Sequence, residues 1–266
     1  MSQKQVIGLI PAAGKAERIM PLPCSKEIFP IGFGPVGKNH VSRPKVVSQY
    51  LLESMRIAEA TRVYIIIRKG KWDIPAYFGD GKKLDMHLAY LIMGLPFGVP
   101  YTLNQAYPFI RDAFVLFGFP DIIFQPEDAF VKLLDRQTET DSDIVLGLFP
   151  VNQRHKGDMV ALDDSGRLKN IEINPKSTNL KLTWIIAAWT SNFSAFMHEY
   201  IQDLTKTVHL EKKRNESNSS QELFFSKVIN AALKKGMRVE TVLFSKGVYL
   251  DVGTPDNLVR AVRDHL

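Results

Sequence analysis

A turn near the amino terminus combines small and basic side chains in a way that suits phosphate. It follows the apolar run Val6–Ile10 and reads Pro11-Ala-Ala-Gly-Lys-Ala-Glu-Arg18. Small side chains let backbone amides approach phosphate oxygens, and basic side chains add charge-assisted contacts. Such a turn also serves plain packing of a strand against a helix, so both interpretations stay open. The candidate phosphate-binding residues are Ala12, Ala13, Gly14, Lys15 and Arg18.

Two common phosphate motifs are excluded at this turn. A Walker loop needs a Gly-Lys-Ser/Thr ending, which is absent. A Rossmann fingerprint fails because Ala16 occupies the place of a glycine and no acidic residue closes a second strand about 20 residues later. Another basic residue, Lys26, follows between a proline-rich turn and a short apolar strand.

Two aspartates stand at the ends of predicted strands. Asp121 follows the apolar run Ala113–Phe117, and Asp251 precedes a helix whose first turn contains Pro255. In open α/β folds the carboxyl edge of the sheet binds ligands. Mg²⁺ favours a few carboxylate oxygens together with substrate phosphate. Asp121 and Asp251 are therefore the candidate metal ligands, and each could instead cap a helix or a turn.

The elements that must position these residues alternate between strands and helices, which predicts an α/β fold with a largely parallel central sheet flanked by helices. We expect the central strands at Gln5–Ile10, Arg62–Ile67, Ala113–Phe117 and Asp143–Phe149, and helices at Pro44–Glu59 and Pro126–Gln137. After Pro150 the strands lie closer together, which predicts a small antiparallel layer. Its strands are expected at Asp158–Leu162, Leu168–Ile173 and Thr183–Trp189, followed by helices at Asn192–Leu204 and Gln221–Lys235 and a strand at Val239–Phe244.

Composition and length indicate one globular domain over residues 1–266, with 45% hydrophobic residues and a net charge of +6. No apolar run reaches the roughly 20 residues of a membrane span, so we expect no membrane association. The first residues lack a signal-peptide pattern and Cys24 is the only cysteine, which favours the cytoplasm. The basic run at 211–214 has no interleaved aromatic residues, so we interpret it as a solvated loop and expect no nucleic-acid partner.

Two strings make the chain resemble a known family. Pro23-Cys-Ser-Lys-Glu-Ile-Phe-Pro-Ile-Gly32 and Tyr249-Leu-Asp-Val-Gly-Thr-Pro255 are similar to segments of the sugar-1-phosphate nucleotidyltransferases. The resemblance implies a Rossmann-like nucleotidyltransferase fold, with a nucleotide-binding part at about 1–150 and a sugar-binding part at about 151–250. It also implies that Arg18 and Lys26 clamp a triphosphate and that Asp121 and Asp251 hold Mg²⁺.

Other implied roles rest on shorter matches. Gly98 stands where the family places a glycine against the nucleobase, and Gly157 stands where a glycine leaves room for the sugar. Asn174 stands where a lysine would contact the sugar phosphate, and Ile173 where a glutamate would meet sugar hydroxyls. Lys176 would supply the missing charge if the backbone stayed extended past Pro175.

The resemblance implies a reaction between a nucleoside triphosphate and a sugar 1-phosphate, glucose 1-phosphate being the expected acceptor, in an enzyme that forms homo-oligomers. Differences from the family pattern keep two alternative functions open. The changes at Ile173, Asn174, Ala16 and Glu17 favour a catalytically silent binding or regulatory module. The Ala-Ala-Gly version of the first turn resembles the cytidylyltransferases that act on an alcohol phosphate.

Overall fold

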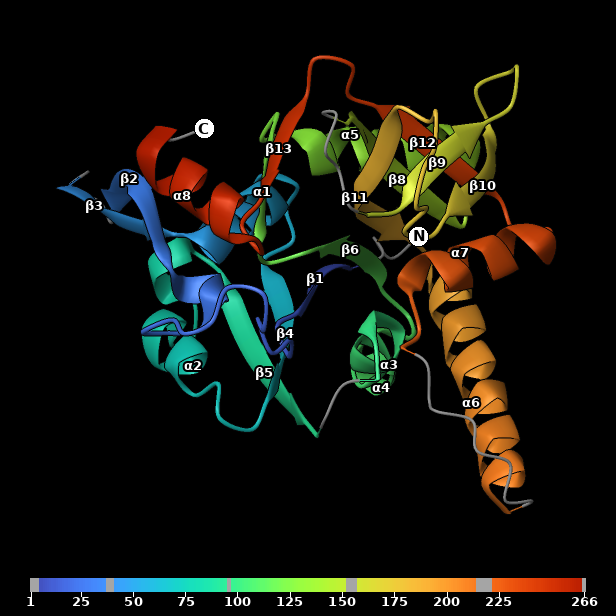
Figure 1. The fold of residues 1–266 in the computed structure, drawn as a ribbon, viewed down its shortest axis with the longest axis horizontal. Coiled ribbons are helices and arrows are strands. Elements are labelled where there is room, and N and C mark those ends of the chain that lie inside the picture. Colours follow the sequence, from blue (N-terminus) through green and yellow to red (C-terminus); the bar gives the residue numbers. More distant parts are fainter. Residues whose placement is uncertain (1–4, 37–40, 95–96, 152–156, 214–221, 265–266) are drawn as a thin grey trace.

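A computed structural model describes residues 5–36, 41–94, 97–151, 157–213 and 222–264 (Figure 1). Its central sheet has seven strands, in the order β12-β8-β11-β6-β1-β4-β5. Every neighbouring pair is parallel except those of β11, which runs antiparallel to β6 and to β8. The strands are β1 (Val6–Pro11), β4 (Arg62–Arg68), β5 (His87–Met93), β6 (Phe114–Gly118), β8 (Ile144–Pro150), β11 (Leu182–Trp189) and β12 (Val239–Leu243).

Helices cover both faces of this sheet, which explains why its central strands are apolar on both sides. Along β6, Val115 and Phe117 face one core and Phe114 and Leu116 face the other. The first core is closed by α3 (Val99–Asn104), α4 (Tyr107–Ile110), α6 (Ser191–Lys213) and α7 (Phe225–Lys234). The second is closed by α1 (Val47–Ile57), α2 (Asp73–Phe78) and α5 (Ala129–Thr140).

Three two-stranded ribbons stand beside the central sheet, each antiparallel. They are β2 (Pro30–Val36) with β3 (Val41–Val46), β7 (Ile122–Gln125) with β13 (Val248–Asp251), and β9 (Met159–Leu162) with β10 (Leu168–Glu172). Helix α8 (Pro255–Asp264) packs against β2 and β13 over a third, smaller apolar cluster. Two short 3-10 turns, η1 (Lys26–Ile28) and η2 (Lys82–Leu84), complete the elements of the described residues.

The predicted α/β class is confirmed, and two details are corrected. The helix expected at Pro44–Glu59 begins at Val47, because residues 44–46 belong to β3 and pair with β2. The strand expected at Thr183–Trp189 is not part of a separate layer. It is β11, inside the central sheet. There it pairs with a strand on each edge, and its side chains are almost all buried. In the described part of the chain no helix is both long and apolar enough to cross a membrane.

Phe117 lies where the two halves of the sheet meet and has no exposed surface. Its ring packs against Phe119, Trp184 and Phe225, with centroids 5.0, 6.1 and 5.1 Å away. We expect Phe117→Ala to lower the free energy of unfolding by about 3–5 kcal/mol, because the cavity cannot collapse fully. Urea denaturation measures this. Phe33→Ala, at a position that is 68% exposed, should change it by about 0.5 kcal/mol or less, and equal losses would contradict this packing.

Candidate active site

Four charged side chains predicted from distant parts of the sequence come together at the carboxyl edge of the sheet. Lys26 follows the turn after β1, Asp121 follows β6, and Asp251 ends β13. Arg18 reaches Asp251 with 4.0 Å between Nη2 and Oδ2. Because β13 pairs with β7 so that Asp251 faces Ile122, the ribbon fixes the two aspartates side by side, and the Val252 amide donates to the Asp121 carbonyl at 2.9 Å.

Lys26 and Asp121 form an ion pair with 2.5 Å between Nζ and Oδ2. Only 16% and 14% of these side chains are exposed. Burial disfavours both charges, but mutual attraction outweighs it: the pKa of Lys26 is raised, with Glu27 adding to the effect, and the pKa of Asp121 is lowered. Both groups are therefore charged at neutral pH.

Asp251 has a different environment. One oxygen accepts a hydrogen bond from the Gly253 amide at 2.8 Å, and Arg18 is a distant partner for the other. Burial, followed by the negative charge of Asp121, raises the pKa of Asp251. The two carboxylates therefore repel each other, and a cation placed between them would relieve this repulsion.

Gly253 marks the point on which these groups converge. A Cβ atom there would lie 2.8 Å from Arg18 Nη2, 2.8 Å from Asp251 Oδ1 and 3.3 Å from Asp121 Oδ2. Any larger residue would displace the charged groups. We did not assign Gly253 from sequence, although it stands in the Asp-Val-Gly-Thr-Pro string that led to Asp251.

The donor set fits Mg²⁺ with substrate oxygens completing its shell. Asp121 and Asp251 direct oxygens toward one small volume, and Mg²⁺ is commonly held by one or two carboxylates plus phosphate. Within the described ranges no group of three or more His, Cys, Asp or Glu side chains could hold a metal. An all-protein cage is thus absent from that part of the chain, and water or substrate oxygens would complete the shell of a metal here.

The first turn has the small residues close to the sheet and the polar ones outside. Ala12 and Ala13 are buried, and the Ala12 amide donates to Ile66 of β4 at 2.8 Å, so this amide is already used. Gly14 and Lys15 are exposed, and a Cβ at Gly14 would meet no atom of the described ranges within 4 Å. Packing within the protein therefore gives no reason for a glycine at this position.

The residues predicted to bind the sugar phosphate are Gly157, Asn174 and Lys176, and of these only Lys176 carries a charge. Gly157 precedes Asp158, whose Oδ1 accepts a hydrogen bond from the Asn174 amide at 3.2 Å, so Gly157 and Asn174 are brought together. Asn174 itself is exposed and has φ 41°. Because β10 ends at Glu172 and Asn174 takes a positive φ, strand alternation does not carry Lys176 to the same face, and a contact from Lys176 to the sugar phosphate stays a prediction.

Close packing explains why residue 98 is a glycine, without any contact to a nucleobase. It precedes α3 with φ 111°, and a Cβ there would lie 2.2 Å from the Leu223 carbonyl oxygen. The Leu223 amide donates to Phe97 at 3.1 Å, which holds the two segments together. A contact from Gly98 to a nucleobase stays a prediction.

Comparison with known proteins follows this geometry. A family model described as nucleotidyl transferase matches residues 7–266, which include all four charged residues of the site. The chain belongs to the nucleotidyl transferase family. Within the family it is similar to the low-salt glycan biosynthesis nucleotidyltransferase Agl11 of Haloferax volcanii, with 22% identity over 260 residues. The match covers 96% of this chain and 64% of that relative, so the chain spans under two thirds of its length.

A solved structure shares the fold. It is described as a glucose-1-phosphate thymidylyltransferase from Bacillus anthracis in complex with a sucrose, and it superposes with a TM-score of 0.76. The likeness covers 98% of this chain and 96% of that one at 18% identity. At this identity the comparison establishes the nucleotidyltransferase fold and no more.

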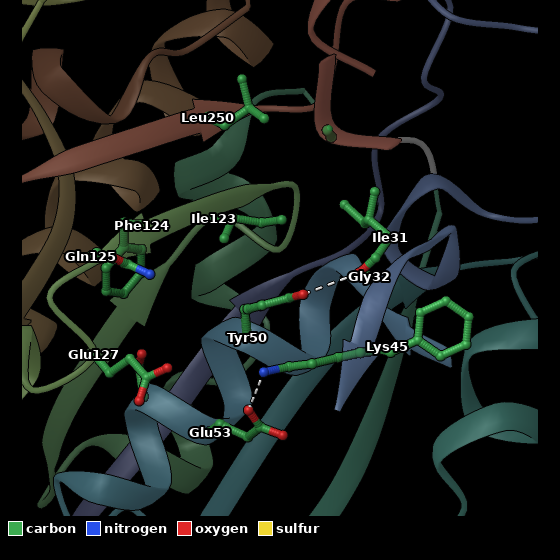
Figure 2. A pocket seen from close by; sticks show the side chains of 13 residues that line it. Ile31, Gly32, Lys45, Tyr50, Glu53, Ile123, Phe124, Gln125, Glu127 and Leu250 are labelled. Carbon is green, nitrogen blue, oxygen red and sulfur yellow. Dashed lines mark hydrogen bonds and ion pairs between the residues drawn. The ribbon is translucent and has the colours of Figure 1, made fainter. Parts of the chain in front are cut away.

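A separate cavity of about 310 Å³ lies between α1, the β2–β3 ribbon and the β7–β13 ribbon (Figure 2). Tyr50 donates to the Ile31 carbonyl at 3.1 Å, and Lys45 pairs with Glu53 with its Nζ 3.7 Å from the Tyr50 ring centroid. Neither Lys26 nor the two aspartates line it. The cavity is therefore outside the candidate active site.

The two glycines give a matched prediction. Gly98→Ala should lower the free energy of unfolding by about 1–3 kcal/mol, because its backbone has positive φ and the added methyl meets the backbone of residue 223. Gly14→Ala, in open space, should change it by about 0.5 kcal/mol or less. Thermal or urea unfolding of the two variants checks this. Equal stability of Gly98→Ala and the unmodified protein would contradict the packing against Leu223.

Proposed function

We propose that this protein transfers a nucleotidyl group from a nucleoside triphosphate to a sugar 1-phosphate and releases pyrophosphate. The observation that supports it is the meeting of four charged side chains at the sheet edge: Lys26 pairs with Asp121, and Arg18, Asp121 and Asp251 converge on Gly253. Family membership supports the nucleotidyl transfer. The names of the similar proteins, one of them a glucose-1-phosphate thymidylyltransferase, favour a sugar phosphate, and glucose 1-phosphate is the first acceptor to test.

The chemistry needs no proton acceptor from the protein. An ionised oxygen of the sugar phosphate attacks the α-phosphorus, the bond from that phosphorus to the bridging oxygen breaks, and pyrophosphate leaves with the electron pair. The nucleophile and the triphosphate are both anions. The work of the protein is therefore to hold them in line and to neutralise the charge that develops.

Lys26 and Arg18 would contribute to that task in different ways. Lys26 stays protonated beside Asp121, and an ammonium has three donors, so two can reach phosphate oxygens while the ion pair persists. Arg18 is 60% exposed and only loosely paired, which leaves its guanidinium free to turn toward the β- and γ-phosphates. Gly14 leaves open space next to them.

Asp121 and Asp251 would hold Mg²⁺, which would neutralise phosphate charge and orient the triphosphate. In its absence Gly253 and Arg18 are the groups that share Asp251. We expect the protein to act in the cytoplasm and as a homo-oligomer.

The sugar side supports a second candidate, a binding module without turnover. Asn174 offers no charge where the resemblance implies a lysine, and its positive φ interrupts the extended backbone by which Lys176 was expected to replace that lysine. Saturable nucleotide binding without pyrophosphate release would favour this candidate.

The activity prediction concerns Lys26. We expect pyrophosphate release from one or two triphosphates with Mg²⁺ and glucose 1-phosphate, and an about hundredfold lower rate in Lys26→Met, because a charge-stabilising donor is lost. Asp121→Asn should lose at least as much. The control is Lys132→Met, a half-exposed lysine on α5 paired with Asp128, which should keep the full rate. Unchanged turnover in Lys26→Met would remove it from the mechanism.

A metal prediction follows from the repulsion between the aspartates. Mg²⁺ should stabilise the unmodified protein by about 1 kcal/mol when present at roughly five times its Kd, because it binds the folded state alone. Asp251→Asn should be at least as stable without Mg²⁺, since a like-charge pair is removed, and should lose the Mg²⁺ effect. Thermal unfolding with and without Mg²⁺ at constant ionic strength measures both. An equal Mg²⁺ shift in the variant would place the metal elsewhere.

A further inference from the structure

Lys71 is a buried lysine that the proposed chemistry does not use. It lies in the turn between β4 and α2, and its Nζ donates to Glu27 Oε1 at 2.5 Å. The side chains are only 5% and 2% exposed. Burial lowers the pKa of Lys71 and raises the pKa of Glu27, so each charge depends on the other.

Two residues later the same turn makes a second contact. Asp73, the first residue of α2, accepts two hydrogen bonds from Ser25: one from its amide at 2.6 Å and one from its hydroxyl at 2.8 Å. Two parallel bonds to one carboxylate fix an orientation as well as a distance. Ser25 is the residue immediately before η1, which begins at Lys26.

The two contacts therefore lie on either side of Lys26. Asp73 holds the residue before it, and Lys71 holds the residue after it. Ser48 of α1 adds a hydrogen bond from its hydroxyl to the Glu27 carbonyl at 2.7 Å. These contacts anchor both neighbours of Lys26 in the chain.

Stability alone is a poor reason for the Lys71–Glu27 pair. Buried ion pairs are often no more stabilising than apolar residues of similar volume. The second oxygen of Glu27, Oε2, is buried and has no hydrogen-bond partner among the described residues, which adds a cost. What the pair does provide is a directed contact that a pair of apolar side chains would not give.

We propose that Lys71 and Asp73 are positioning residues that hold the Ser25–Glu27 segment so that the Lys26 ammonium stays at the Asp121 edge of the site. This inference rests on the proposed function, in which Lys26 contacts the triphosphate. Lys71 and Asp73 do not touch the reacting atoms and act through the segment.

The kinetic test uses variants that should fold. Asp73→Asn can accept only one of the two Ser25 bonds, and Lys71→Met with Glu27→Gln removes both buried charges together. We expect kcat to fall about tenfold or more in each while KM for the sugar phosphate changes little, because the loss is in transition-state alignment. Lys71→Arg, which keeps charge and donors, should restore most of kcat relative to Lys71→Met. The control is Asp128→Asn, a carboxylate at the start of α5 that should leave kcat unchanged.

A second readout needs no turnover. Trace acetylation followed by mass spectrometry reports how accessible each lysine amine is. In Asp73→Asn and in the Lys71→Met/Glu27→Gln variant, acetylation of Lys26 should rise about threefold relative to the unmodified protein, because the segment opens locally. Lys15, which is exposed already, should not change.

Failure of the proposed function and failure of the positioning role give different results. If the unmodified protein releases no pyrophosphate with any triphosphate, the proposed function fails and the acetylation of Lys26 alone decides the positioning role. Unchanged Lys26 acetylation in both folded variants would overturn that role. Where the unmodified protein turns over, full kcat in both variants would overturn it too.

Discussion

The buried Lys26–Asp121 ion pair is the interaction on which the site depends. It joins a segment that follows β1 to the end of β6, and neither charge could remain buried without the other. Further charged side chains extend from it in both directions. Asp251 and Arg18 lie on the solvent side, and Glu27 with Lys71 lies toward the core. The arrangement neutralises each buried charge while leaving the exposed cation available to an anionic substrate.

Much of the fold could be predicted because its signals are local. Apolar runs such as Phe114–Gly118 and Ile144–Pro150 have the length and burial of central strands, and the residues that end them are readable as candidate ligands. Asp121 and Asp251 were found in this way. The place of β11 could not be predicted, because an apolar strand does not reveal which neighbours it will have. Its insertion between β6 and β8 is determined by tertiary packing.

The site residues that sequence reasoning missed have no local signature. Lys71 and Asp73 stand in an ordinary turn, and their partners Glu27 and Ser25 are far away in the chain. For Gly98 the sequence indicates an important glycine, but it does not reveal that the backbone there lies close to Leu223. The strand alternation expected to reach Lys176 ends earlier, because a single residue, Asn174, takes a positive φ.

The β7–β13 ribbon has a consequence for how the protein is made. Asp121 leaves the ribosome together with β7, well before its ribbon partner β13 exists. A nascent chain that has exposed β7 therefore still lacks the second carboxylate. Only when β13 is added do the two like charges meet. The repulsion between the two carboxylates is thus a property of the assembled ribbon, and a chain that has not yet formed it carries Asp121 without that repulsion.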